Sequence, residues 1–362
     1  MTADDRVSRD TGTRLEGDPV VLGLVPETPG VAVGIVLITT GIIWAGSGWL
    51  EAAAESLAGY YGLPAVVQGS IIIAVGSSFP ELASVVITAL SGSFSMGVGA
   101  VVGSAVFNVL VIPALSGIAA ETPVGADRTV VYKEAQFYMI AVSALVITFA
   151  LAVIYFPTGG VGLNGRITRP LAAIPLVLYG LYLFIQWQDV NDYESEAPAG
   201  DIDVARSWGI LVLGLGTILV GVEFLVGAVE TLNAAFGIPE FLAGVTIIAA
   251  ATSLPDALVS VRAARDGRGV TSLGNVLGSN TFDLLVAIPV GVMIVGSATV
   301  SFAVAAPMFG VLTVATILLF TVLRTDMALT GPESYLLLLA YGVFVVWVIG
   351  ETIGVFDLIV GA

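Results

Sequence analysis

Long apolar stretches, separated by short polar connectors, make up most of the chain. Ten of them, each about 18–27 residues long, can cross the roughly 30 Å hydrocarbon core of a bilayer as helices. We predict these spans at 31–53, 64–90, 95–119, 134–156, 170–188, 207–232, 239–263, 270–296, 300–323 and 333–359. Residues 1–30 are polar and acidic, and their only apolar run is too short for a signal-peptide core, so we expect a soluble N-terminal tail there.

A polar, acidic linker at 189–206 separates two groups of five spans, 31–188 and 207–362. A shift of 175 residues aligns the groups without a gap, and 26 of the 77 positions from Gly34 to Leu110 then match identically. Because each group holds an odd number of spans, the second copy enters the membrane from the opposite side. The sequence therefore predicts an all-α polytopic membrane protein with ten transmembrane helices in two inverted five-helix repeats.

Inverted repeats of this kind are typical of secondary transporters, which bind their substrates at the midplane between the repeats. A duplicated bundle with a purely structural role is the alternative interpretation. We keep both open at this point, and the polar residues inside the spans decide between them.

The Lys and Arg residues predict which side each connector faces, because positively charged connectors stay in the cytoplasm. With the N-terminus outside, the outer connectors carry only Arg166 and Arg169. The inner connectors then carry Arg128, Lys133, Arg206, Arg262, Arg265, Arg268 and Arg324. We therefore expect a multi-pass protein of the cell membrane with an extracellular N-terminus and a cytoplasmic linker. The acids of that linker do not follow an EF-hand loop, so we expect a solvated surface there.

Composition removes several function classes. Hydrophobic residues make up 57% of the chain and charged residues 11%, with a mean hydropathy of +1.01, whereas soluble domains carry about 25% charged residues. The chain has no Cys and no His, which excludes disulfides, thiol catalysis, imidazole relays and Cys or His metal sites. We expect no enzyme activity and no cofactor, and the absence of a P-loop argues against an ATP-driven pump.

The net charge of −16 argues against nucleic acid and other anionic partners and favours cations. The lipid bilayer is the other partner that the composition implies. No segment of the sequence points to an obligate protein partner.

Three carboxylates lie deep within predicted spans, where a charge costs a few kcal/mol and usually marks an ion pathway. Glu81 and Asp256 are repeat mates, and Asn108 occupies the position equivalent to Asp283. Glu81 precedes Asn108 by 27 residues, and Asp256 precedes Asp283 by the same number. Two copies of one geometry thus offer four polar side chains to one place.

The neighbours of these residues favour cation binding. Pro80 and Pro255 directly precede the first two acids, and a proline frees the carbonyl four residues back, which survives in a membrane only where it is buried or lines a cavity. Hydroxyl groups recur three or four residues before the acids and before Asn108: Ser77, Ser78, Ser104, Thr252, Ser253 and Ser279. A set of ligands made only of oxygen suits hard cations such as Na⁺ and Ca²⁺.

Each of these features also has a structural interpretation. Asn108 can bridge two helices, and each hydroxyl can bond the backbone of its own helix. The small residues Gly99, Gly103, Gly274 and Gly278 are expected to let helices pack closely.

The paired motifs GSSFPE with GAVVGSAVFN, and ATSLPD with GNVLGSNTFD, resemble the two α-repeats of the sodium/calcium exchangers in the cation/Ca²⁺ antiporter superfamily. The resemblance covers both repeats. It implies electrogenic exchange of several Na⁺ for one Ca²⁺ by alternating access, with the first and sixth spans sliding across the bundle. It also implies that the six hydroxyls complete the Na⁺ shells around Glu81, Asp256, Asp283 and Asn108, together with the backbone carbonyls of Ala74 and Ala249.

The chain departs from the family pattern in a few places. Many microbial members have Glu where Asp256 stands, so a shorter side chain is expected to alter ion affinity or Na⁺ number. The first repeat has Ala100 and Ala105 at positions where the second has Asn275 and Asn280. We expect this difference to affect the packing or polar contacts of the third span and not the site itself.

Charge counting gives a hypothesis for the mechanism. Three ionised acids carry a charge of −3, which three Na⁺ neutralise and one Ca²⁺ reduces to −1. The two sets of ions are therefore expected to exclude each other. An empty site with a charge of −3 is expected not to switch between the two sides of the membrane, because moving that charge through the low-dielectric interior is costly. A H⁺/Ca²⁺ exchanger of the same superfamily is the first alternative, because carboxylates also carry protons. A cation channel and a non-transporting scaffold are alternatives of other classes.

Overall fold

The computed structural model describes residues 28–62, 74–159, 163–190 and 202–356. Most of the predicted tail and linker, the start of the second predicted span and the last residues of the tenth lie outside this part. In the first half the elements are α1 (Pro29–Tyr60), α3 (Ala74–Ser77), α4 (Phe79–Ser91), α5 (Phe94–Ala119), β1 (Val124–Gly125), η2 (Thr129–Glu134), α6 (Ala135–Tyr155), β2 (Asn164–Thr168) and α7 (Arg169–Val190).

The second half repeats this order with additional breaks. Its helices up to the third span are α8 (Val204–Phe236), α9 (Glu240–Ala243), η3 (Gly244–Ile248), α10 (Ala249–Thr252), α11 (Leu254–Arg265), α12 (Gly269–Phe282), η4 (Asp283–Ala287) and α13 (Ile288–Val295). They are followed by β3 (Ser297–Ser301), α14 (Phe302–Arg324), β4 (Ala328–Leu329) and α15 (Gly331–Thr352). The segments η2, η3 and η4 are turns of π-helix.

The prediction of an all-α polytopic membrane protein is confirmed. Among the described residues, eight helical segments are long and apolar enough to cross a membrane, and the bent pair Glu240–Thr252 with Leu254–Arg265 makes a ninth. The predicted span at 64–90 is represented by α3 and α4. Helices α1 and α8 continue to Tyr60 and Phe236, past the predicted ends at 53 and 232, because the polar residues there do not stop a helix.

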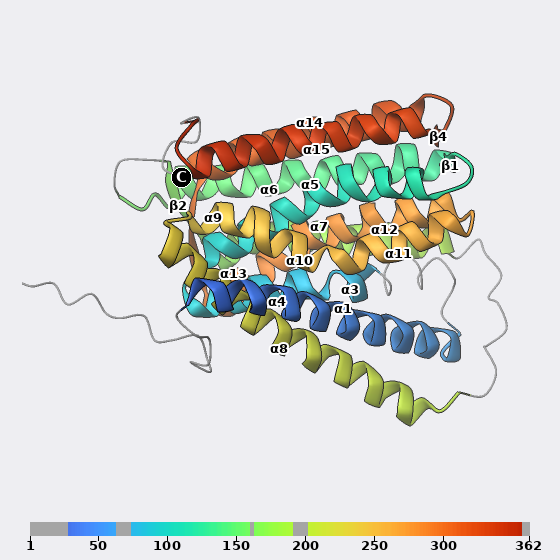
Figure 1. Ribbon diagram of the computed structural model, residues 1–362, viewed down its shortest axis with the longest axis horizontal. Coiled ribbons are helices and arrows are strands. Elements are labelled where there is room, and N and C mark those ends of the chain that lie inside the picture. The colour runs from blue at the N-terminus through green and yellow to red at the C-terminus, as the bar shows by residue number, and fades with distance from the viewer. Residues whose placement is uncertain (1–27, 63–73, 160–162, 191–201, 357–362) are drawn as a thin grey trace, which may run out of the picture.

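Two short β-pairs, which the hydrophobic pattern did not predict, show the direction of the helices. Strand β1 pairs with β4, and β2 pairs with β3, and Figure 1 places the pairs at opposite ends of the bundle. Helix α6 runs from the first pair to the second, whereas its repeat mate α14 runs from the second pair to the first. The two copies are therefore inverted relative to each other, as predicted.

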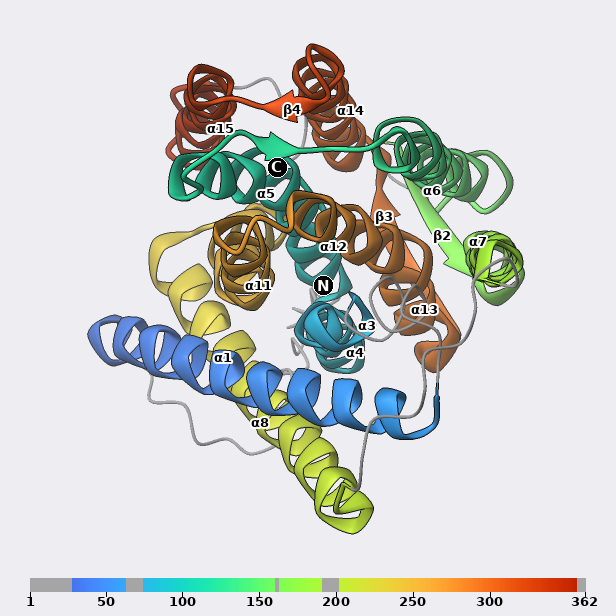
Figure 2. The same ribbon diagram turned by 90° about the vertical axis from the view of Figure 1, so that its right-hand side faces the viewer.

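Helices α1 and α8 form a crossed pair on one side of the bundle, with α14 and α15 on the opposite side (Figure 2). Small residues allow the crossing. A Cβ atom at Gly214 would lie 2.9 Å from the Gly46 carbonyl oxygen, and one at Gly221 would lie 2.8 Å from Ile43 Cγ1. Gly46 thus lies against Gly214, and Ile43 lies against Gly221. The helices α1 and α8, which are repeat mates, therefore run antiparallel.

The centre of the bundle is helix α5, whose small residues admit the broken helix of the other half. A Cβ atom at Gly99 would collide with the Phe241 backbone, and one at Gly103 would collide with the Val245 carbonyl. The prediction of close packing is therefore confirmed for these two glycines. It is wrong for Gly274, because a Cβ atom there would meet no atom of the described residues within 4 Å.

Candidate cation-binding site

Two broken helices place the first pair of carboxylates. Helix α3 ends at Ser77 and α4 begins at Phe79, while α10 ends at Thr252 and α11 begins at Leu254, with a bend of 46° in the second case. Each proline is the second residue of the new helix, where its missing N–H costs nothing. Glu81 and Asp256 consequently lie in the first turns of α4 and α11, where the positive end of the helix dipole favours a negative charge.

Two central helices supply the other pair of polar side chains. Asn108 lies in the middle of α5, and Asp283 begins the π-helical turn that follows α12. All four side chains, Glu81, Asn108, Asp256 and Asp283, are fully buried. Glu81 and Asp256 both lie within electrostatic range of Asp283, so the three acids share one region of the interior.

Serine hydroxyls connect Glu81 and Asp256 to the opposite half of the protein. Ser104 donates to Glu81 Oε1 at 3.2 Å, and its repeat mate Ser279 donates to Asp256 Oδ1 at 3.1 Å. Each of these serines also meets a serine of the other half. Ser253 Oγ donates to Ser104 Oγ at 2.7 Å, and the hydroxyls of Ser77 and Ser279 are 3.1 Å apart.

The equivalent positions Asn108 and Asp283 break the symmetry of the site. The Asn108 side-chain amide donates to Asp256 Oδ2 at 3.0 Å, whereas a carboxylate at position 283 has no proton to donate to Glu81. Among the described residues, Asn108 and Ser279 thus donate to Asp256, and Ser104 donates to Glu81, which the Thr252 hydroxyl also adjoins. Within the part of the chain that the structure describes, the buried site oxygens without a hydrogen-bond partner include both carboxylate oxygens of Asp283, Glu81 Oε2, Ser78 Oγ and Asn108 Oδ1.

Buried oxygens without partners are costly, because each loses its bonds to water and gains none in return. Among the described residues, no Lys or Arg forms an ion pair with Glu81, Asp256 or Asp283. The site is thus rich in acceptors and poor in donors. A cation would satisfy such a set of oxygens.

The described residues contain no three carboxylates close enough together to hold one ion among themselves. An ion at this site would therefore combine carboxylate oxygens with hydroxyl, amide and backbone oxygens. The predicted ligand set has this composition.

Two of the predicted ligands, Thr252 and Ala249, are only partly available. Thr252 Oγ1 donates to the Ile248 carbonyl at 3.1 Å, which is the local bond that the structural interpretation foresaw, and the hydroxyl also lies beside Glu81. The Ala249 carbonyl accepts the Ser253 amide at 3.0 Å and, at 3.5 Å, the Thr252 hydroxyl. Ala74 is the first residue of α3.

Asn280 belongs to the site, contrary to the expectation that the Ala105 and Asn280 difference affects only the third span. Its Oδ1 accepts the Asn108 amide at 3.0 Å, and its Nδ2 donates to Tyr138 at 3.2 Å and to the Ala105 carbonyl at 3.1 Å. Because Ala105 and Asn280 are repeat mates in direct contact, the pseudo-twofold axis passes between them. The signal in the sequence was the spacing of three residues between Asn280 and Asp283 on one helix face.

Glu51 is a second residue that the sequence search missed. It lies in α1 with one carboxylate oxygen buried and unpartnered, and it is within electrostatic range of Asp256. Its repeat mate is Val226, so a search for mirrored acids passes over it.

Fold and site together define a class: a polytopic membrane transporter of two inverted repeats that meet around buried carboxylates. The sodium/calcium exchanger protein family matches residues 31–188 and 206–350. The chain belongs to this family, which consists of cation/Ca²⁺ transporters and not of enzymes.

Individual relatives agree with this assignment. The sodium/calcium exchanger MaX1 of Methanosarcina acetivorans is 23% identical over 294 residues, covering 69% of this chain and 80% of that protein. The putative antiporter CaxA of Alkalimonas amylolytica is 28% identical over 265 residues, covering 73% and 79%. A solved structure of the sodium-calcium exchanger NCX_Mj, soaked with Na⁺ and Sr²⁺, matches the fold with a TM-score of 0.60 at 23% identity, covering 88% of this chain and 99% of that one.

Proposed function

We propose that the protein exchanges Na⁺ for Ca²⁺ by alternating access, with Glu81, Asn108, Asp256 and Asp283 holding the ions. The observation that carries this proposal is the set of buried, unpartnered oxygens around carboxylates that have no cationic side chain beside them. Cations from solution would satisfy them. The serines Ser77, Ser78, Ser104, Ser253 and Ser279, with Thr252 and the carbonyls of Ala74 and Ala249, complete the shells in this proposal.

Charge balance makes the two ion sets exclude each other. Three Na⁺ neutralise the three acids, and one Ca²⁺ leaves −1, so a site filled by one set has neither the room nor the charge for the other. An empty site at −3 is costly to carry across the low-dielectric interior. Ions therefore cross only in exchange for other ions.

The crossed pair of α1 and α8 is the element proposed to switch access. Where α1 and α8 cross, Gly46 lies against Ile218 and Gly221 lies against Ile43, so the two helices pack closely and can move as one unit. Both helices lie at one side of the bundle, apart from the scaffold of α14 and α15 (Figure 2). The site can then open to either side while the ions remain at the midplane.

H⁺/Ca²⁺ exchange is the second candidate, because every acidic group of the proposed site is a carboxylate and a carboxylate can also carry a proton. Protons can replace Na⁺ in the same charge balance. Flux measurements separate the two coupling ions.

The test is uptake of radiolabelled Ca²⁺ into proteoliposomes with an imposed outward Na⁺ gradient, an imposed pH gradient, or neither. The proposal expects uptake driven by Na⁺ and lost in the double variant Glu81→Gln with Asp283→Asn. Glu55→Gln, on the exposed end of α1, is the matched control and should transport normally. Uptake that follows the pH gradient and ignores Na⁺ would establish the H⁺-coupled alternative, and uptake unchanged in the double variant would reject the site.

A further inference from the structure

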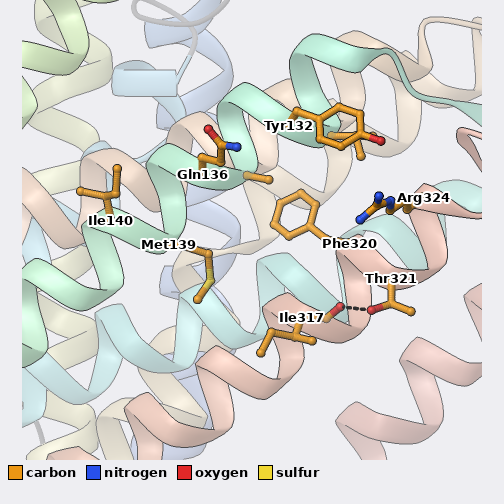
Figure 3. A pocket seen from close by; sticks show the side chains of 10 residues that line it. Tyr132, Gln136, Met139, Ile140, Ile317, Phe320, Thr321 and Arg324 are labelled. Carbon is orange, nitrogen blue, oxygen red and sulfur yellow. Dashed lines mark hydrogen bonds between the residues drawn. The ribbon is translucent and has the colours of Figure 1, made fainter.

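A groove outside the ion site lies between α6 and α14, near the β1–β4 pair (Figure 3). Its volume is about 560 Å³, which is in the range of pockets that hold small molecules. Met139, Ile140 and Ile317 line its apolar part, Phe320 lies between, and Tyr132 and Arg324 lie at the other end (Figure 3). A groove that is apolar along one part and has the Arg324 guanidinium at its end suits an amphiphile, a molecule with an apolar chain and a polar headgroup.

The groove opens onto the surface that faces the bilayer. Ile140 is 47% exposed and Ile317 is 55% exposed, although both lie in segments that cross the membrane, Val131–Tyr155 and Phe302–Arg324. Lipid chains are the medium in contact with such a surface. The apolar part of the groove is therefore accessible to an acyl chain.

The guanidinium of Arg324 supplies the charge. Its Cζ lies 5.7 Å from the centroid of the Tyr132 ring, a cation–π contact that fixes its direction. Within the described residues Arg324 has no ion pair, whereas the nearby Lys133 Nζ donates to Gln186 at 2.7 Å. A planar guanidinium matches the geometry of a phosphate.

We propose that this groove binds one anionic phospholipid, with its phosphate at Arg324 and an acyl chain along Met139, Ile140 and Ile317. A basic side chain near the membrane surface favours anionic over zwitterionic headgroups, because the latter carry a compensating positive charge. The bound lipid joins α6 to α14, one helix from each half, and so stabilises the folded bundle. None of the ion-site residues lines the groove, so a test of lipid binding does not depend on the proposed transport function.

The experiment compares phosphatidylglycerol and phosphatidylcholine on the delipidated full-length protein in neutral detergent. Native mass spectrometry measures lipid retention, and a thermal melt measures the stability that each lipid adds. We expect the wild type to retain phosphatidylglycerol about fivefold more than phosphatidylcholine, the ratio that one charged contact supplies, and to melt higher with phosphatidylglycerol. Arg324→Gln should remove both differences, and Ile317→Trp should reduce retention of either lipid by filling the groove.

Two control variants carry the same chemical changes elsewhere. Arg265→Gln removes an exposed charge from α11, and Val314→Trp adds bulk to the 67% exposed Val314 of α14, and neither residue lines the groove. Both should behave like the wild type. Equal retention of the two lipids by the wild type, or equal losses in Arg265→Gln and Arg324→Gln, would overturn the proposal and leave only non-specific annular lipid.

Discussion

Asn108 and Asp283 occupy the same place in the two halves, and the difference between amide and carboxylate makes the site asymmetric. The Asn108 amide and Ser279 both donate to Asp256, so part of the charge of Asp256 is already stabilised. In the described part of the chain, neither oxygen of Asp283 accepts a hydrogen bond, and one oxygen of Glu81 accepts none. At the residue scale the unsatisfied negative charge is therefore concentrated on Glu81 and Asp283.

Replacing Asp283 by Asn tests this concentration of charge. The variant loses one charge and one oxygen ligand, and we expect its apparent Ca²⁺ affinity to fall about 10- to 100-fold, the worth of a hydrogen bond or contact to a charged group. Ca²⁺ titrations of transport in proteoliposomes measure this. Asp266→Asn is the control, because Asp266 is exposed and paired with Arg268 at 3.1 Å; an equal loss in both variants would contradict the assignment.

Asn280→Ala tests the positioning of Asn108. Without its partner at 3.0 Å, the Asn108 amide is free to turn from Asp256, and one neutral hydrogen bond of about 1 kcal/mol corresponds to about fivefold weaker Ca²⁺ binding. We expect the KM for Ca²⁺ to rise while the maximal rate changes little. Thr148→Ala, which removes a buried hydroxyl bonded only within α6, should leave KM unaltered, and a matching rise there would indicate a general packing defect.

At the scale of elements, the two broken helices and the central helices α5 and α12 do most to build the site. Pro80 and Pro255 predicted a disturbance at the right place in each half, and the structure turns both into helix starts with an acid in the first turn. The π-helical turn at Asp283 and the hydrogen bond from Asn108 to Asn280 were not predictable from hydrophobic spacing. They depend on how α5 and α12 cross, which no single stretch of sequence encodes.

The crossing of α1 and α8 can be tested with two glycines of one helix. A Cβ atom at Gly214 would lie 2.9 Å from backbone atoms of α1, whereas one at Gly216 would meet nothing within 4 Å. We expect Gly214→Val to destabilise the protein by about 1–3 kcal/mol through overpacking and to slow transport, and Gly216→Val to do neither. Thermal melts and flux assays measure both effects, and equal behaviour of the two variants would argue against the interface.

For the whole molecule, the sequence repeat and the length of the apolar runs predicted the inverted, all-helical architecture, because membrane helices must satisfy their backbone internally. The four short strands escaped prediction because they lie in connectors or at span ends and contain only two to five residues. The side of the membrane that each end faces remains a prediction from the Lys and Arg distribution.

Single cysteines can test the orientation, because the natural chain has none. Glu121 lies just before β1, and Gly159 lies before β2 at the other end of the bundle, where an added Cβ meets open space. We expect a membrane-impermeant maleimide applied to whole cells to label Gly159→Cys and to spare Glu121→Cys. The reverse labelling would place the N-terminus inside.

The central claim is that one buried set of oxygens binds Na⁺ and Ca²⁺ in turn. Equilibrium binding of radiolabelled Ca²⁺ to the purified protein, titrated with NaCl or with choline chloride at equal ionic strength, tests it most directly. The account predicts that Na⁺ displaces Ca²⁺ cooperatively, that choline does not, and that Glu81→Gln with Asp283→Asn abolishes the binding. Ca²⁺ that stays bound at saturating Na⁺, or that binds the double variant as well as the wild type, would contradict it.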